Sequence, residues 1–147
     1  MYMTQIRPNL FVGSEAAATD LKSLKRYQIS AILNLDGPGQ YYPVPTKCTF
    51  LHTYIQDGQP IPENLLYQIL NFLTQQIQAG KNVLIHCAIG ISRSPAIAIA
   101  YFLWTYPKMT WEQAYREVGA HLSISPAKEL ENSIKEFIEN NRLNQSK

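Results

Sequence analysis

Apolar residues follow two spacings along this chain: short β-branched runs, and longer stretches with helical periodicity. The short runs predict four strands, at residues 9–13, 29–35, 49–55 and 82–86. The helical spacing predicts five helices, over residues 15–27, 62–79, 94–106, 110–119 and 125–140. The helix at 94–106 is apolar on most of its sides, so we expect it to lie buried at the centre of the molecule.

Turn and capping residues mark the ends of these elements. Ser14 stands where it can cap the first helix, and Pro62 stands at a helix start, where its missing N–H costs nothing. Gly80 is placed to end that second helix. Thr110 and Gln113 have the spacing of a capping box, which predicts a helix start at this point.

Strands that are connected through helices predict the fold class. We expect an α/β protein with a central, mostly parallel sheet of four to five strands, flanked by helices. Function in such sheets lies at the carboxyl ends of the strands, and Cys87 follows directly after the strand at 82–86. Residues 1–147 are about the length of one domain, with a frayed tail expected over residues 141–147.

Composition narrows the class of protein. Hydrophobic residues make up 46% of the chain and charged residues 16%, which is enough apolar material for a core. A net charge of +2 does not favour a nucleic acid or a membrane as the main partner. With two cysteines and no apolar run of about 18–20 residues, we expect a cytoplasmic protein without a disulfide framework, with a monomer favoured.

The segment 83–95 carries the candidate chemistry: an apolar strand, a cysteine, a short loop with one glycine, and an arginine. An isolated thiol is mostly protonated at pH 7, so a cysteine nucleophile needs help to ionise. Three features favour the thiolate of Cys87: the N-terminus of the following helix, inward-pointing backbone N–H groups of the loop, and the charge of Arg93. Gly90 allows a turn that a side chain would oppose.

The same features suit a phosphate group. The guanidinium of Arg93 can hold two phosphate oxygens side by side. Ser94 can donate to the sulfur when it becomes a leaving group, and His86 is expected to support the loop by hydrogen bonding rather than by proton transfer. The other residues expected to bind phosphate are those of the loop itself: Ala88, Ile89, Gly90, Ile91 and Ser92.

Residues 86–94 match the H-C-x-x-G-x-x-R-[S/T] signature of the cysteine-dependent protein phosphatases, and their Gly-Ile-Ser-Arg-Ser ending resembles the dual-specificity group. Residues 6–14 and 29–35 are similar to strands of that group, and residues 123–126 to the connection before its last helix. The resemblance therefore covers nearly the whole chain. Two positions depart from the usual pattern: Ile89 where a small residue is common, and Ala127 where asparagine is common.

The resemblance implies a general acid, because the family carries an aspartate roughly thirty residues before the cysteine. Asp57 is 30 positions upstream of Cys87, beside Gly58. Its alternative role is that of an ordinary Asp-Gly turn residue, like Asp36 before Gly37. The implied reaction has two steps, forms a cysteinyl phosphate, and uses no metal or other cofactor.

The function expected from the resemblance is a protein phosphatase that hydrolyses phosphotyrosine and phosphoserine or phosphothreonine in a phosphorylated protein substrate. An alternative is a same-fold phosphatase acting on a phosphoinositide, an RNA 5′-phosphate or a phosphosugar. Two further alternatives are a phospho-binding module with little turnover and a thiol enzyme of redox or sulfur transfer. A disulfide between Cys48 and Cys87 is a minor possibility, and the role of the Tyr41–Tyr42 pair stays open.

Overall fold

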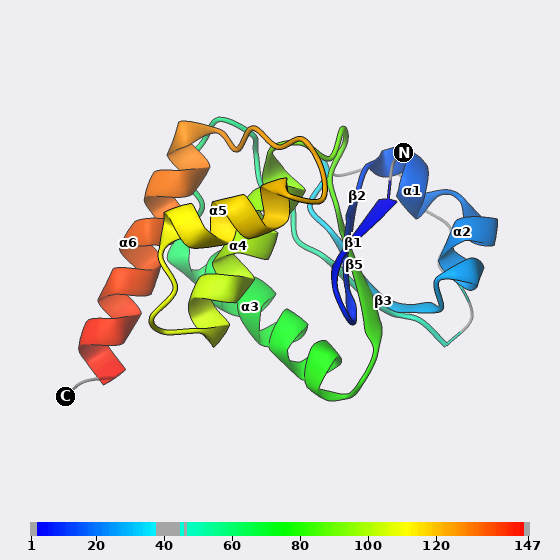
Figure 1. The fold of residues 1–147 in the computed structure, drawn as a ribbon, viewed down its shortest axis with the longest axis horizontal. Coiled ribbons are helices and arrows are strands. Elements are labelled where there is room, and N and C mark those ends of the chain that lie inside the picture. Colours follow the sequence, from blue (N-terminus) through cyan, green and yellow to red (C-terminus); the bar gives the residue numbers. More distant parts are fainter. Residues whose placement is uncertain (1–2, 38–44, 46, 146–147) are drawn as a thin grey trace.

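The computed structural model describes residues 3–37, 45 and 47–145. Within these residues five strands form one sheet, in the order β1-β2-β5-β3-β4 (Figure 1). Only β1 and β2 pair antiparallel, and the other neighbours are parallel. The strands are β1 (Met3–Arg7), β2 (Leu10–Gly13), β3 (Ile29–Asn34), β4 (Thr49–His52) and β5 (Asn82–His86). The predicted fold class is confirmed.

Helices cover both faces of the sheet. The short helices α1 and α2 lie on one face and α3 to α6 on the other (Figure 1). Alternate side chains of β5 pack on opposite faces of the sheet. Leu84 packs with α1 and α2, whereas Val83 and Ile85 pack with the apolar cluster of α3 to α6. The helices are α1 (Glu15–Ala18), α2 (Leu21–Arg26), α3 (Glu63–Gln78), α4 (Arg93–Thr105), α5 (Trp111–Gly119) and α6 (Lys128–Gln145).

The register of the sheet places the end of β5 at the centre of one edge. His86 is level with Gly13 of β2 and with Asn34 of β3. The carboxyl ends of three parallel strands therefore meet at this point, and Cys87 is the first residue beyond it. Helix α4 leaves from the same point and is buried along most of its length, as predicted.

Three element boundaries differ from the prediction. The N-terminal strand is a hairpin of two strands, and Asn9 adopts a positive φ of 75° at its turn. The first helix is broken in two because the side chain of Asp20 accepts from the backbone N–H groups of Lys22 and Ser23 and starts a new helix there. β4 ends at His52, although the N–H of Ile55 still donates to the carbonyl of Leu35.

The predicted caps have mixed outcomes. Thr110 and Gln113 form the capping box, and Gly80 follows α3 with a positive φ of 79°. Ser14 occupies the N-cap position of α1, but its side chain makes no capping hydrogen bond.

Helix α6 ends the described part of the chain. α6 is helical as far as Gln145, through most of the segment 141–147. The Tyr41–Tyr42 pair lies outside the described residues. Within the described part of the chain, no helix is both long enough and apolar enough to cross a membrane.

Candidate active site

Cys87 lies buried at the end of β5, with 2% of its surface exposed. Its Sγ is 3.2 Å from Oγ of Ser94, and that hydroxyl also donates to the carbonyl of Gly13 at 3.2 Å. A hydroxyl has one proton, so it can serve only one of these partners at a time. Ser94 can therefore donate to a thiolate, or donate to Gly13 while it accepts from a thiol.

The loop after Cys87 is anchored on the turn between β2 and α1. The N–H of Glu15 donates to the carbonyl of Ala88 at 2.9 Å. Gly90 has a φ of +91°, and a Cβ there would come within 3.1 Å of the Gly13 backbone. Because the conformation is strained for any other residue and the contact is tight, this position favours glycine.

Arg93 is the first residue of α4 and reaches toward the ends of two other segments. Its Nη1 donates to the carbonyls of Ile55 at 3.0 Å and Leu35 at 3.4 Å. Its Nη2 is 3.4 Å from Oδ1 of Asp36, and both side chains are largely buried, at 12% and 13% exposure. Asp36 is thus part of the site although the sequence suggested only a turn. The strand register indicates this role, because Asn34 is level with His86, so Asp36 follows the end of β3 beside the loop that begins at Cys87.

Asp57 lies above the loop, on the segment that follows β4. Its Oδ1 accepts a hydrogen bond of 2.6 Å from the hydroxyl of Ser92. The same hydroxyl accepts from the backbone N–H of Ala127 at 3.0 Å. Ser92 therefore ties the candidate acid to the loop and to the start of α6, a contact that the sequence did not reveal.

These residues surround one small cavity of about 180 Å³. Cys87, Arg93 and Asp57 all line it, with the rest of the predicted loop and with Ser125. Ser94 is fully buried against the sulfur. The structure thus brings the sequence-predicted site residues together around a space in which a thiol, a guanidinium and a carboxyl group can act on one small anion.

His86 is fully buried behind the loop. Burial is the main influence on this side chain and lowers its pKa to about 4, although a hydrogen bond with the Cys87 backbone and the nearby Asp36 carboxylate act in the opposite direction. The imidazole is therefore neutral at pH 7. The positive charge beside the thiol comes from Arg93 and not from this histidine.

Both cysteines are free, so the alternative of a Cys48–Cys87 disulfide is not what the structure contains. Cys48 packs with the apolar cluster of α1 and α2, whereas Cys87 belongs to the cluster on the other face. Within residues 3–37, 45 and 47–145, no three His, Cys, Asp or Glu side chains come together in an arrangement that could hold a metal ion.

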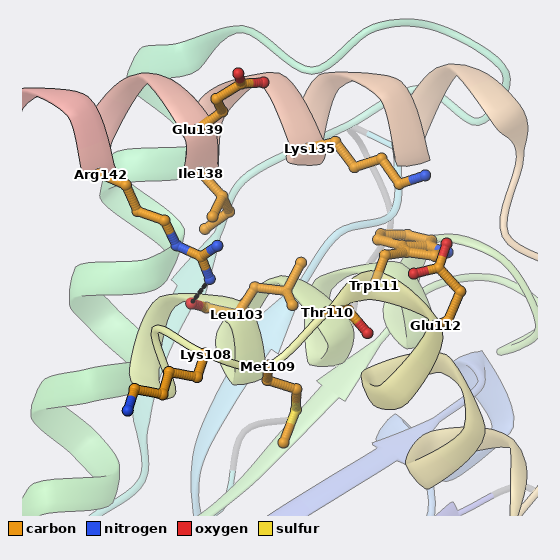
Figure 2. A pocket seen from close by; sticks show the side chains of 10 residues that line it. All are labelled: Leu103, Lys108, Met109, Thr110, Trp111, Glu112, Lys135, Ile138, Glu139 and Arg142. Atoms are coloured by element: carbon orange, nitrogen blue, oxygen red, sulfur yellow. Dashed lines mark hydrogen bonds between the residues drawn. The ribbon is translucent and has the colours of Figure 1, made fainter.

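A larger cavity of about 680 Å³ lies at the far end of α4, between that helix, α5 and α6 (Figure 2). Lys135 lies 5.7 Å from the ring centroid of Trp111, and Arg142 donates to the carbonyl of Leu103 at 3.4 Å. None of the predicted site residues lines this cavity.

The sheet, the loop and the thiol together define a cysteine-dependent phosphatase class. The family model described as "Dual specificity phosphatase, catalytic domain" matches residues 10–142. The chain therefore belongs to the dual specificity phosphatase family.

Known proteins agree with this assignment. The chain is 34% identical over 127 residues to tyrosine-protein phosphatase vhp-1 of Caenorhabditis elegans. The matched region covers 84% of this chain and 19% of that protein. It is 29% identical over 144 residues to dual specificity protein phosphatase MPK-4 of Drosophila melanogaster, with 93% and 33% covered. The human tyrosine phosphatase-like serine/threonine/tyrosine-interacting protein superimposes with a TM-score of 0.84 at 26% identity, over 97% and 98% of the two chains. The chain thus spans a third or less of the two curated relatives.

Proposed function

We propose that this protein is a protein phosphatase that hydrolyses phosphotyrosine and phosphoserine or phosphothreonine through a phosphorylated Cys87. The observation that carries the proposal is the cavity of about 180 Å³ that Cys87, Arg93 and Asp57 line together. The family assignment supports it, because relatives named as tyrosine and dual specificity protein phosphatases match this chain.

Arg93 is the proposed phosphate clamp. Its Nη1 group is engaged by two backbone carbonyls and its Nη2 by Asp36. In this proposal the edge of the guanidinium formed by Nε–H and the second Nη2–H binds two phosphate oxygens. The contacts to Leu35, Ile55 and Asp36 hold the guanidinium in one orientation before the substrate arrives, which supports rapid capture.

The first step forms a sulfur–phosphorus bond and breaks the bond from phosphorus to the substrate oxygen. The Cys87 thiolate attacks, and the proton of Asp57 goes to the leaving oxygen. Loop N–H groups and Arg93 stabilise the charge that spreads over the equatorial oxygens.

In the second step water attacks phosphorus and gives a proton to the Asp57 carboxylate. The sulfur–phosphorus bond breaks, inorganic phosphate leaves, and the returning thiolate accepts a hydrogen bond from Ser94. The distance of 3.2 Å between Sγ and Oγ supports this role. Ser92 keeps Asp57 above the loop in both steps through its 2.6 Å hydrogen bond.

A non-protein phosphate is the alternative substrate. Substrates with several phosphate groups need cations around the one that reacts. The variable loop residues Ala88, Ile89, Ile91 and Ser92 carry no charge, and Arg93 is the single cation among the lining residues in the part of the chain that the structure describes. This composition favours a substrate with one phosphate group over a substrate with several.

The test is a rate comparison on phosphotyrosine and phosphothreonine peptides, a phosphoinositide and a 5′-phosphorylated RNA. We expect the peptides to have the highest kcat/KM, by about ten-fold or more. Cys87→Ser should abolish turnover, and the matched Cys48→Ser variant should retain it. A higher kcat/KM on the phosphoinositide or the RNA would overturn the substrate class. Full activity of Cys87→Ser would overturn the mechanism.

A further inference from the structure

A second cavity, of about 350 Å³, lies directly beside the candidate active site. Ile89, Gly90 and Ile91 line both cavities and form the wall between them. The remaining walls come from the β1–β2 hairpin and from the connection between α5 and α6, and their residues are Thr4, Val12, Gly13, His121, Leu122 and Ser123. A substrate held at Cys87 therefore extends past this cavity if its chain continues over the shared wall.

The wall is an exposed apolar ridge. Ile89 is 73% exposed and Ile91 is 43% exposed. When another apolar surface covers isoleucine side chains that are this exposed, their removal from water stabilises the complex. Because the ridge separates the two cavities, a ligand that occupies both would cover it.

The ridge is also fixed in place. Gly90 packs so closely against the Gly13 backbone that a Cβ there would lie 3.1 Å from it, a tight contact. On the opposite side, the N–H of Ser125 donates to the carbonyl of Ile91 at 2.6 Å. Because the wall is already fixed, little conformational entropy is lost when a ligand binds. The second cavity is therefore suited to specific recognition.

The lining decides which kind of side chain fits. Among the described residues that line this cavity there is no aspartate, glutamate, lysine or arginine. A second phosphate or a charged side chain would lose hydration there and find no permanently charged partner, since His121 is the one titratable side chain among the described lining residues. The volume is at the lower end of the range for cavities that hold small organic groups, about 300–1,000 Å³. An apolar side chain fits both the size and the chemistry.

We propose that this cavity is a subsite for one large apolar side chain of the phosphoprotein substrate, two residues from the phosphorylated residue. In an extended peptide, side chains two residues apart point to the same side and are separated by about 7 Å. The phosphorylated side chain then enters the cavity at Cys87, and the second side chain passes over the Ile89–Ile91 ridge. The inference rests on the proposed function, since it assumes a peptide substrate.

The experiment uses phosphotyrosine peptides with alanine at all flanking positions, into which leucine, aspartate or phosphoserine is placed from three residues before to three after. At the position two residues before or two residues after the phosphotyrosine, but not at both, we expect leucine to give a kcat/KM about ten-fold higher than aspartate. Leu122→Ala and Ser123→Glu should reduce this preference to about two-fold and leave kcat/KM on an aryl phosphate unchanged. Leu65→Ala, also partly buried but on α3, should keep the preference.

Each outcome separates the subsite from the proposed function. Binding of the same peptides to Cys87→Ser, measured by fluorescence anisotropy, should follow the same order. Good turnover with no dependence on the flanking residue, or a preference for a second phosphoresidue, would overturn the subsite and leave the protein phosphatase assignment standing. If no phosphopeptide is hydrolysed or bound while a phosphoinositide is, both proposals fail together. Ser123 is exposed, so its variant tests the cavity even if Leu122→Ala does not fold.

Discussion

The two ends of helix α4 carry cavities of opposite character. The cavity at the N-terminal end has a volume of about 180 Å³, and the one at the C-terminal end about 680 Å³. In the smaller cavity a thiol, a guanidinium and a carboxyl group face one shared space. In the larger cavity two of the cations are engaged elsewhere, since Lys135 forms an ion pair of 2.6 Å with Glu131 and lies near the ring of Trp111, and Arg142 donates to the carbonyl of Leu103. Convergence of polar groups, rather than cavity size, marks the candidate site.

The backbone of α4 adds to this difference. The N-terminus of a helix carries a partial positive charge and the C-terminus a partial negative charge. Cys87 and its loop lie before the positive end. At the negative end Arg142 donates to the carbonyl of Leu103, as a cation that caps a helix does (Figure 2). An anion is therefore favoured at one end only.

The largest effect is expected from exchanging the guanidinium at each end of α4. Arg93→Lys removes a planar pair of donors, and we expect kcat/KM on an aryl phosphate to fall about 10³-fold. Arg142→Lys keeps a cation near the C-terminus of α4 and should change kcat/KM less than about two-fold. Steady-state kinetics and the vanadate inhibition constant measure both variants. Equal losses in the two variants would contradict the functional difference between the cavities.

The next effect concerns stability and depends on pH. The pKa of His86 is about 4 in the folded protein, against an ordinary value of 6.5. Between these two values the imidazole is protonated in the unfolded chain and neutral in the folded protein. The contribution of His86 to the free energy of unfolding is therefore fully present above pH 6.5, and it falls by about 3 kcal/mol as the pH decreases to 4. Urea unfolding at pH 7, 5.5 and 4 measures it. His86→Asn should flatten this dependence, whereas His121→Gln should retain it; an unchanged slope in His86→Asn would contradict the assignment.

Asp57→Asn should lower kcat about 10²-fold on phosphoserine peptides, whose leaving oxygen needs a proton. The loss should be smaller on aryl phosphates, because their leaving groups depart more easily without protonation. Glu112→Gln, in the larger cavity, is the matched control and should leave both rates unchanged. The measurement is kcat across substrates with different leaving groups. A uniform loss across that series would assign Asp57 to binding rather than to proton transfer.

Much of the fold was predictable because its signals are local. The apolar run before Cys87, the mostly apolar helix α4 and the capping box at Thr110 each depend on residues close in sequence, and each is confirmed. The break between α1 and α2 was missed because Asp20 looks like any polar helix residue until its side chain is seen to accept two backbone N–H groups.

The site was predictable for residues in one motif and less so for residues that only the sheet brings together. Cys87, Arg93 and Ser94 lie within eight positions of one another, so a pattern can capture them. Asp36 reaches Arg93 across 57 positions of sequence, and Ser92 reaches Asp57 across 35. Those contacts follow from strand register and from the path of a loop, which no local pattern encodes.

The smallest effect compares the N-cap residues of α4 and α5, each of which lines one of the two cavities. Thr110 accepts from the N–H of Gln113, so Thr110→Ala should lower the free energy of unfolding by about 1 kcal/mol and leave kcat unchanged. Ser92 makes no capping bond within its own helix; its hydroxyl joins Asp57 to the N–H of Ala127. Ser92→Ala should cost a similar free energy of unfolding, about 1 kcal/mol, because Ala127 loses its acceptor.

Ser92→Ala should also lower kcat on phosphoserine peptides by about ten-fold, because Asp57 is no longer held above the loop. Urea unfolding and steady-state kinetics on the two variants separate these effects. A loss of stability in Ser92→Ala with an unchanged kcat would mean that substrate binding alone positions the acid. An equal loss of kcat in both variants would mean that general weakening of the fold, and not the Ser92 contact, limits turnover.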